Sequence, residues 1–240
     1  MKLDILVFAA HPDDAELGCS GTILKHIAQG KKVGIVDLTR GELGTRGTAQ
    51  TRDEEAANAS QIMGLHIREN LNMRDGFFKN DEQHQLQIIR TLRTYRPEIV
   101  LANAYHDRHP DHGRACDLVT DAVFLSGLVK IETVFNGEAQ HTWRPKLVLH
   151  YIQDRYIEPD IVVDITDFWG QKMECIQAFK TQFYSPKATD TEAETYISSP
   201  DFVKFLDARA REFGKYAHST YAEGFTSRKI LAVDDLFHLH

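Results

Sequence analysis

The sequence Ile5-Leu-Val-Phe-Ala-Ala-His-Pro-Asp-Asp14 decides the fold of this chain. It begins with a continuous apolar run, which is typical of a central parallel strand covered on both faces. Pro12 cannot donate a hydrogen bond to a sheet, so the strand ends there. Because residues 18–29 predict a helix, the polar residues His11, Asp13 and Asp14 lie in the first strand-to-helix loop. Open α/β sheets bind their ligands at such loops.

The next segments repeat this order. Residues 32–38 and 98–103 predict buried strands, and residues 67–71 predict a short one. Residues 51–63, 81–95 and 114–124 predict helices; the first has Thr51 as its N-cap and Glu54 completing a capping box. Strand, helix and strand in close succession imply a right-handed crossover between parallel strands. We therefore expect an α/β fold with a mostly parallel central sheet.

The C-terminal third has a weaker pattern. Residues 146–151 and 161–165 predict strands, Asp167 is the expected cap of the next helix, and residues 201–216 predict another helix. Residues 185–200 predict a loop with a short helical piece, and Tyr221-Ala-Glu-Gly-Phe225 has no clear period. No repeat or linker is visible, so we expect one domain over residues 1–240.

Composition excludes several classes of protein. The 240 residues are 42 % hydrophobic with a net charge of −7, and no basic run is present, so nucleic acid is not expected as a partner. The apolar runs are strand-sized, which predicts no membrane span, and no signal peptide precedes the first strand, so we expect a cytoplasmic protein. Three widely spaced cysteines predict neither a disulfide framework nor a cysteine metal site.

A second polar cluster, His109-Pro-Asp-His112, follows the strand at 98–103. Two such loops at the carboxyl ends of parallel strands can face each other across one crevice. His11, Asp14 and His112 together make a set of two imidazoles and one carboxylate, which suits a zinc-like ion with a position left open for water. Fe²⁺ fits the same set, because these ligands do not fix the metal.

The remaining polar residues of the two clusters suggest acid–base chemistry. Asp13 lies beside Asp14 and can take a proton from water, and His109 is expected near the metal without binding it. Asp111 can orient a nearby imidazole through a hydrogen bond. Arg52 opposes the dipole of its helix in the first turn, so it is either a solvated residue or an anchor for substrate or for an oxyanion. His106 and Asp107 are expected to be ordinary loop residues.

Two other classes of function compete with a hydrolase. A phosphate-handling protein could hold Mg²⁺ between paired aspartates, but magnesium prefers oxygen ligands and this set is rich in histidine. A non-catalytic carbohydrate- or metal-binding module would have no use for Asp13, which is spare once the metal is bound.

Ala10-His-Pro-Asp-Asp14 and His109-Pro-Asp-His112 resemble the two signatures of the zinc-dependent PIG-L/LmbE-like N-deacetylases. The resemblance implies a Rossmann-like three-layer fold and removal of acetyl groups from N-acetylglucosamine conjugates. It implies His11, Asp14 and His112 as zinc ligands and Asp13 as general base. It also implies His109 as a second acid–base group or oxyanion stabiliser, oriented by Asp111.

Within that family the sequence is most similar to the bacillithiol-biosynthesis deacetylases, on the following stretches: Gly34-Ile-Val-Asp-Leu-Thr39, Glu42-Leu43 with the loop to Arg52-Asp-Glu-Glu55, Asp107-Arg-His-Pro-Asp-His112 and Tyr221-Ala-Glu-Gly-Phe225. This similarity implies N-acetylglucosaminyl-malate as substrate, with Arg52 and Arg108 on the substrate side. It also implies a homo-oligomer, commonly a hexamer. The loop at residues 43–47 should border the pocket.

Overall fold

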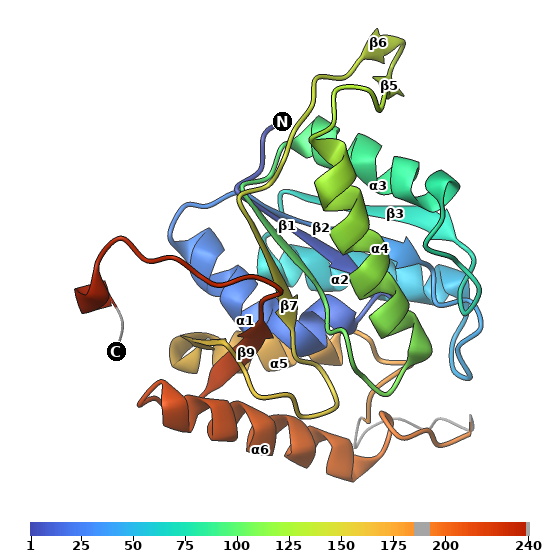
Figure 1. Cartoon of the computed structure of the whole chain (residues 1–240). Coiled ribbons are helices and arrows are strands. Elements are labelled where there is room, and N and C mark those ends of the chain that lie inside the picture. Colours follow the sequence, from blue (N-terminus) through green and yellow to red (C-terminus); the bar gives the residue numbers. More distant parts are fainter. Residues whose placement is uncertain (185–192, 239–240) are drawn as a thin grey trace.

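The strand that precedes the first polar cluster, β1 (Ile5–Ala9), lies inside a seven-stranded sheet with the order β3-β2-β1-β4-β7-β9-β8. The computed structural model describes residues 1–184 and 193–238, and Figure 1 shows their arrangement. The other strands of the sheet are β2 (Val33–Thr39), β3 (Ile67–Met73), β4 (Ile99–Asn103), β7 (Leu147–Tyr151), β8 (Ile161–Asp164) and β9 (Ala222–Thr226). Neighbouring strands are parallel except β9, which is antiparallel to both β7 and β8.

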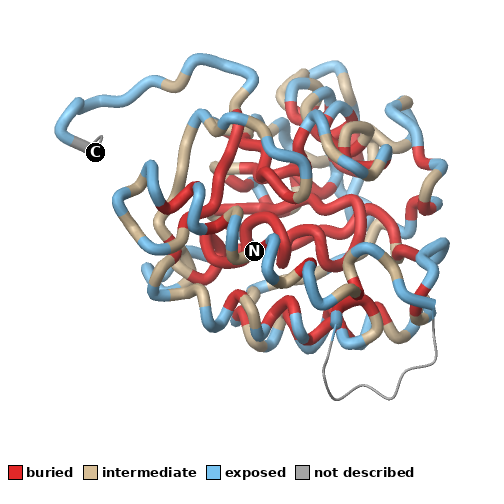
Figure 2. Tube along the Cα trace, turned by 90° about the horizontal axis from the view of Figure 1, so that it is seen from below, coloured by how far each residue is buried: buried red, intermediate tan, exposed pale blue. Residues whose placement is uncertain are grey.

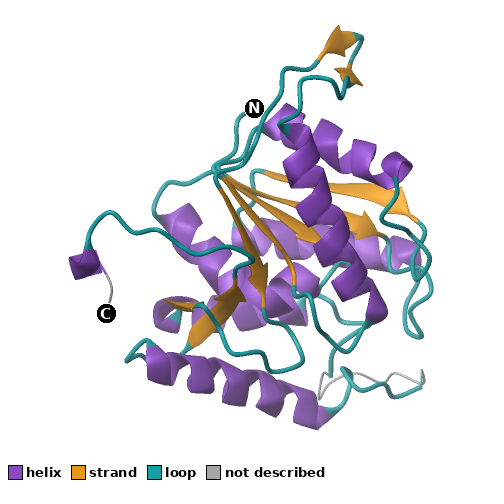
Figure 3. Cartoon of the chain, viewed as in Figure 1, coloured by secondary structure: helices purple, strands orange, loops and turns teal. Residues whose placement is uncertain are grey.

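Helices cover both faces of this sheet (Figure 3). One face carries α1 (Asp14–Ala28), α2 (Ala49–Met63) and α5 (Trp169–Gln177); the other carries α3 (Glu82–Tyr95) and α4 (Pro110–Ser126). Val7 of β1 belongs to the first hydrophobic cluster and its neighbour Phe8 to the second, and both are fully buried. Figure 2 shows this buried interior between exposed outer helix faces. The predicted three-layer α/β fold with a mostly parallel sheet is confirmed.

The last helix also contributes to the first face, because its Phe202 and Leu206 belong to the first hydrophobic cluster. Helix α6 (Pro200–Tyr216) packs along β9, and β5 (Val134–Phe135) pairs with β6 (Glu138–Ala139) in a small hairpin at the top of Figure 1. Two short 3₁₀ turns cover Thr166–Phe168 and Leu236–His238. Among the helices of the described residues, none has the length and apolar character to span a membrane.

Several predicted helix starts were wrong, including that of α4, which begins at Pro110 rather than at residue 114. Helix α1 begins at Asp14 rather than at residue 18. Its first turn carries Asp14 and Glu16, which suit a helix N-terminus but interrupt the apolar stripe on which the prediction depended. Helix α2 begins after Thr48, whose side chain accepts from the main-chain N–H of Thr51 in a capping box. Thr51 is therefore the third residue of the helix and not its N-cap.

Strand β9 was not predicted, because its sequence lacks an apolar pattern. It contains Glu223, which is buried against Lys172, and Gly224, which packs under the ring of Phe213. Helix α5 begins at Trp169, so Asp167 lies in the preceding 3₁₀ turn and is not the helix cap. The predicted loop at residues 185–200 lies partly outside the described residues, and α6 begins at its last residue, Pro200.

Candidate active site

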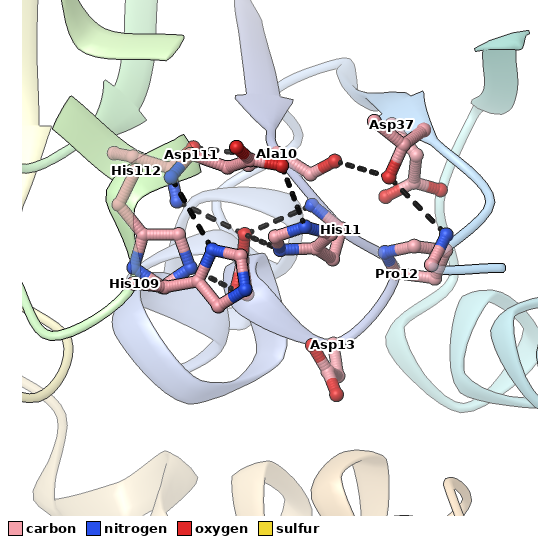
Figure 4. A network of polar contacts seen from close by, with 12 residues as sticks. Ala10, His11, Pro12, Asp13, Asp37, His109, Asp111 and His112 are labelled. Carbon is pink, nitrogen blue, oxygen red and sulfur yellow. Dashed lines mark hydrogen bonds and ion pairs between the residues drawn. The ribbon is translucent and has the colours of Figure 1, made fainter. Parts of the chain in front are cut away.

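The two polar clusters meet where the strand order of the sheet reverses. The chain runs from β1 outward to β2 and β3, and then returns to β4 on the other side of β1. The loops after β1 and β4 therefore lie side by side at the carboxyl ends of the strands, where such sheets bind ligands. The ring centroids of His11 and His109 are 4.6 Å apart, and those of His109 and His112 are 5.4 Å apart. Figure 4 shows the three rings close together.

Asp14 lies between His11 and His112. Its Oδ1 is 3.1 Å from Nε2 of His112, and its Oδ2 is 3.5 Å from Nδ1 of His11. All three residues are buried. Nitrogen atoms of His11, His109 and His112 also lie within 4.8 Å of one another, as do ligand atoms of His11, Asp75 and Asp111. The geometry thus allows a metal ion here. Of the predicted set, Asp14 contacts both His11 and His112, whose ring centroids lie 5.7 Å apart.

Neighbouring carboxylates shift the pKa values of these residues. Burial by itself would lower the pKa of His11, but hydrogen bonds to Asp111, Asp14 and Asp75 raise it well above the usual value. Burial opposes the charged form of His112 too, yet the charge of Asp14 and the contact with Asp107 raise its pKa to about 9. Burial would raise the pKa of Asp14, but the two imidazoles hold it well below its usual range. The cluster therefore favours added positive charge.

Three further residues hold these side chains in place, and the sequence did not indicate them. Asn103 donates to Oδ2 of Asp14 over 3.0 Å, and Gln153 donates to its Oδ1 over 2.7 Å. Asp107 contacts Nδ1 of His112 at 2.7 Å, which leaves Nε2 to face Asp14. Asp107 was expected to be an ordinary loop residue. A carboxylate bonded to the far nitrogen of a ligating imidazole is a common arrangement, so its position five residues before His112 was the available signal.

Asp13 lies to one side of the three rings (Figure 4). Nη2 of Arg52 donates to its Oδ2 over 2.8 Å and also to the carbonyl oxygen of Pro12. Burial raises the pKa of Asp13 to about 7, although the charge of Arg52 lowers it. A carboxylate with a pKa near neutrality suits a general base. Arg52, predicted on the substrate side, lines the pocket and is bonded to this carboxylate. Its Nε is buried and has no hydrogen-bond partner among the described residues.

The structure corrects the expected partner of Asp111. Its Oδ2 accepts from the main-chain N–H of Gly76 over 2.8 Å and lies 3.3 Å from Nε2 of His11, while Arg114 binds its other oxygen. Its side chain therefore contacts His11 and not His109. The reason is that α4 starts at Pro110, so His109 is the N-cap and its Nδ1 accepts from the main-chain N–H of Asp111.

Asp75 joins the same group from the turn after β3. Its Oδ1 is 3.0 Å from Nε2 of His11, and its Oδ2 accepts from the main-chain N–H of Leu43. The local sequence did not indicate that the carboxylate of Asp75 reaches His11. Asp75 thus ties the loop after β2 to the polar cluster.

His109 differs from its two neighbours in protonation. Burial, together with the charges of His11 and His112, lowers the pKa of His109 to about 4. The ring is therefore neutral at pH 7. Because Nδ1 accepts from the main chain, the proton of the neutral ring lies on Nε2, where it can be donated to an oxyanion.

A pocket of about 420 Å³ opens over these residues. Residues 43–46 of the loop after β2 line it, as expected, and so do Gln182 and residues 195–197 of the C-terminal third. Arg108, predicted on the substrate side, lies in the wall, where its Nε donates to Asp154 over 3.0 Å and its guanidinium lies 4.9 Å from the ring centre of Tyr196. The pocket therefore offers cationic and aromatic groups next to the polar cluster.

Comparison with known proteins places the chain among deacetylases. The family described as GlcNAc-PI de-N-acetylase (PIG-L) matches residues 6–123, which include both polar clusters. The uncharacterized deacetylase YaiS from Escherichia coli is 33% identical over 148 residues, covering 58% of this chain and 75% of that protein. Diacetylchitobiose deacetylase from Thermococcus kodakarensis is 27% identical, covering 92% of this chain and 81% of that protein. The crystal structure of the conserved protein TT1542 from Thermus thermophilus superposes with a TM-score of 0.84 at 36% identity, covering 97% of this chain and 98% of that one.

More distant relatives carry different names. A probable N-acetyl-alpha-D-glucosaminyl L-malate deacetylase 2 from Bacillus subtilis is 26% identical, covering 76% of this chain and 84% of that protein. A 4-oxalmesaconate hydratase from Pseudomonas putida is also 26% identical, covering 74% of this chain and 73% of that protein. Similarity alone therefore does not select one substrate.

Proposed function

The chain belongs to the PIG-L family of deacetylases, and from this premise we propose that it is a zinc-dependent hydrolase of N-acetylglucosaminyl-malate. It is a hydrolytic enzyme, and N-deacetylation of N-acetylglucosamine-type substrates is the activity that the family and the relatives support. Under our proposal the products are glucosaminyl-malate and acetate. The observation that carries the proposal is Asp14 held between His11 and His112, with Asp13 immediately before it in the chain.

The donor set fits a divalent metal ion. Two imidazole nitrogens and a carboxylate converge, all buried, and the pKa values of both imidazoles are raised because acidic groups surround them. A bound cation can take the place of the protons on the two imidazole rings, because a metal ion binds the deprotonated nitrogen of histidine. Under our proposal His11, Asp14 and His112 hold zinc, with Fe²⁺ as the alternative. When bound, the metal would polarise the acetyl carbonyl and make water a better nucleophile.

The protein residues supply the proton transfers. Asp13 takes the proton of the attacking water, for which its pKa of about 7 is suited. His109 donates its Nε2 proton to the developing oxyanion. Asp13, which then carries the proton taken from water, gives it to the leaving amine, without which the C–N bond does not break; the neutral ring of His109 has no second proton to give. Arg52 orients Asp13 through the hydrogen bond between them, and Asp111 supports His11 rather than His109.

The malate conjugate is favoured by the chemistry of the pocket wall. Arg108 lies beside Tyr196 at the side of the cavity, where a cation and an aromatic ring can receive a carboxylate and a sugar face. The bacillithiol pathway is the place in which such a substrate would be consumed. A second acetylated amino sugar is the alternative within the same chemistry, and a non-catalytic carbohydrate-binding module is the alternative outside it.

We propose two further properties together with this function. The protein is cytoplasmic, and it is a homo-oligomer, commonly a hexamer in such enzymes. Sedimentation velocity of the purified chain measures the second property: a single species at the mass of a monomer would contradict it.

Acetate release tests the proposal. Purified, metal-analysed protein is offered N-acetylglucosaminyl-malate, N-acetylglucosamine and diacetylchitobiose side by side, with His112→Ala as a control that should lose metal and activity together. Rapid release from the malate conjugate alone is the expected result. Release only from another sugar keeps the deacetylase and discards the malate substrate. No release from any of the three by zinc-loaded protein contradicts the proposal, and hydration of 4-oxalmesaconate would then be assayed because one relative carries that name.

A further inference from the structure

A buried ion pair is bonded to the main chain in the middle of α1. Nζ of Lys172, on α5, lies 2.6 Å from Oε1 of Glu223, on β9, and each side chain is 4% exposed. The two carboxylate oxygens of Glu223 accept from the main-chain N–H groups of Gly21 and Thr22 over 2.9 and 2.7 Å. Lys172 also donates to the carbonyl oxygen of Leu17 over 2.8 Å. Glu223 belongs to the C-terminal sequence that showed no pattern and that the proposed mechanism does not use.

These contacts all involve main-chain groups of one turn of α1, from Leu17 to Thr22. In a regular α-helix the N–H of Gly21 donates to the carbonyl of Leu17, and here each of those groups has a charged side-chain partner. Side chains that enter the main-chain ladder bend a helix. Gly18, in the same turn, allows the ring of Tyr151 to pack closely against the helix, since a Cβ at that position would lie 2.2 Å from the ring. The ion pair therefore fixes the first part of α1 to α5 and β9.

Leu17 connects this ion pair to the active site. Its carbonyl accepts from Lys172, and its N–H donates to the carbonyl of Asp13 over 2.9 Å. Leu17 lines the active-site pocket with Asp13, and it also lines a small cavity with Lys172 and Glu223. Two hydrogen bonds thus lead from Lys172 to the main chain of Asp13.

We propose that Lys172 and Glu223 are positioning residues that hold the first turn of α1, and with it Asp13 and Asp14, in the geometry needed for metal binding and proton transfer. Asp13 has φ 114°, a conformation that a residue with a side chain keeps only when its surroundings impose it. Without the pair, the first turn can relax and move Asp14 relative to His11 and His112. This inference rests on the proposed function for its kinetic readout but not for its spectroscopic one.

The test uses Lys172→Met, Glu223→Gln and the double variant in the full chain. Ile88→Ala is the matched control, because Ile88 is fully buried on α3, which contributes no residue to the pocket. Each protein is loaded with Co²⁺, whose visible absorption reports the geometry of its ligands. Thermal unfolding, Co²⁺ affinity, kcat and KM are measured in parallel.

We expect kcat and Co²⁺ affinity to fall about 10- to 100-fold in each single variant, with an altered cobalt spectrum. KM should stay within about twofold, because the wall residues Arg108 and Tyr196 are untouched. The double variant buries no unpaired charge, so it should be more stable than either single variant. Its kcat and spectrum should nevertheless stay altered, because methionine cannot donate to the carbonyl of Leu17.

Recovery of the cobalt spectrum and of kcat in the double variant would overturn the proposal, since the ion pair would then matter for stability alone. A loss no greater than that of Ile88→Ala would overturn it as well. If a single variant does not fold, the double variant decides. If the wild-type protein releases no acetate, the proposed function fails, while cobalt affinity and spectrum still decide whether the pair positions Asp14.

Discussion

At Asp13 the main chain adopts φ 114° and ψ −23°, which is unusual for a residue other than glycine. Such conformations are disfavoured by about 1–3 kcal/mol and persist where surrounding contacts impose them. The contacts are the Leu17 N–H on the Asp13 carbonyl and Arg52 on both the Asp13 carboxylate and the Pro12 carbonyl. The strain turns the carboxylate of Asp13 away from that of Asp14, so that adjacent residues can perform different tasks.

Replacing Asp13 by asparagine tests its task as a base. Asp13→Asn keeps the size of the side chain and a hydrogen-bond acceptor for Arg52 but cannot take a proton, so we expect kcat to fall about 10²- to 10⁴-fold with the metal retained. Acetate release and metal analysis measure the two effects. Asp53→Asn is the control, because Asp53 is an exposed carboxylate bonded to Arg40. Undiminished turnover in Asp13→Asn would show that another group is the base.

A second prediction concerns Asp107. Asp107→Asn removes the negative charge beside Nδ1 of His112, so the imidazole becomes a weaker ligand and metal affinity should fall about 10- to 100-fold. Competition with a chelator measures the affinity. Asp81→Asn is matched to it, because Asp81 makes the same kind of contact with His84 on α3. An equal loss in both variants would mean that the contact with His112 has no special role.

At the scale of elements, the start of α2 brings Arg52 to the site. Thr48 caps this helix, its carbonyl accepts from the main-chain N–H of Arg52, and the buried Arg52 side chain reaches the loop after β1. The predicted position of this helix start was wrong by three residues, yet Arg52 remains in the first turn because Thr48 and Thr51 form the capping box together.

Thr48→Ala should lower the free energy of unfolding by about 1 kcal/mol, because the N–H of Thr51 loses its acceptor. Urea denaturation measures this loss. Thr48→Ser keeps the hydroxyl and should stay close to the wild type. A similar loss in the serine variant would assign the effect to the methyl group of threonine instead of the cap.

At the scale of the whole molecule, a buried histidine outside the proposed set of metal ligands couples folding to pH. Nδ1 of His150, on β7, contacts the carbonyl of Asn103, on β4, at 3.0 Å and lies 3.3 Å from Sγ of Cys116, on α4. Burial, with a smaller contribution from the charge of Arg228, lowers the pKa of His150 to about 4. An unfolded chain binds this proton near pH 6.5. The contribution of His150 to the free energy of unfolding is therefore fully present above pH 6.5 and is lost as the pH falls toward 4.

His150→Gln should remove that part of the acid sensitivity. Between pH 7 and pH 5 the loss of unfolding free energy should be smaller than in the wild type by about 2 kcal/mol, since glutamine does not titrate. Urea denaturation at both pH values measures it with the same metal content. His141→Gln is the control, because His141 is exposed. Equal pH dependence in His150→Gln and wild type would contradict a depressed pKa.

The layers, the central strand and the two polar clusters could all be predicted from local sequence. Continuous apolar runs specify strands buried on both faces, and Pro12 and Pro110 mark where a strand must end and a helix can begin. The resemblance of the two clusters to a deacetylase family was also legible in sequence, and the family match confirmed it.

Only the tertiary structure decided which side chains touch. The fold brings four further residues to the cluster: Asp75, Asn103, Asp107 and Gln153. It pairs the Asp111 carboxylate with His11, where His109 was expected, and it places Glu223 against α1. Strand β9 escaped prediction because its central residues are a buried carboxylate and a glycine. Hydrophobic periodicity predicts which side chains face the core. Contacts between polar groups far apart in the chain depend instead on strand order and register, which no local pattern encodes.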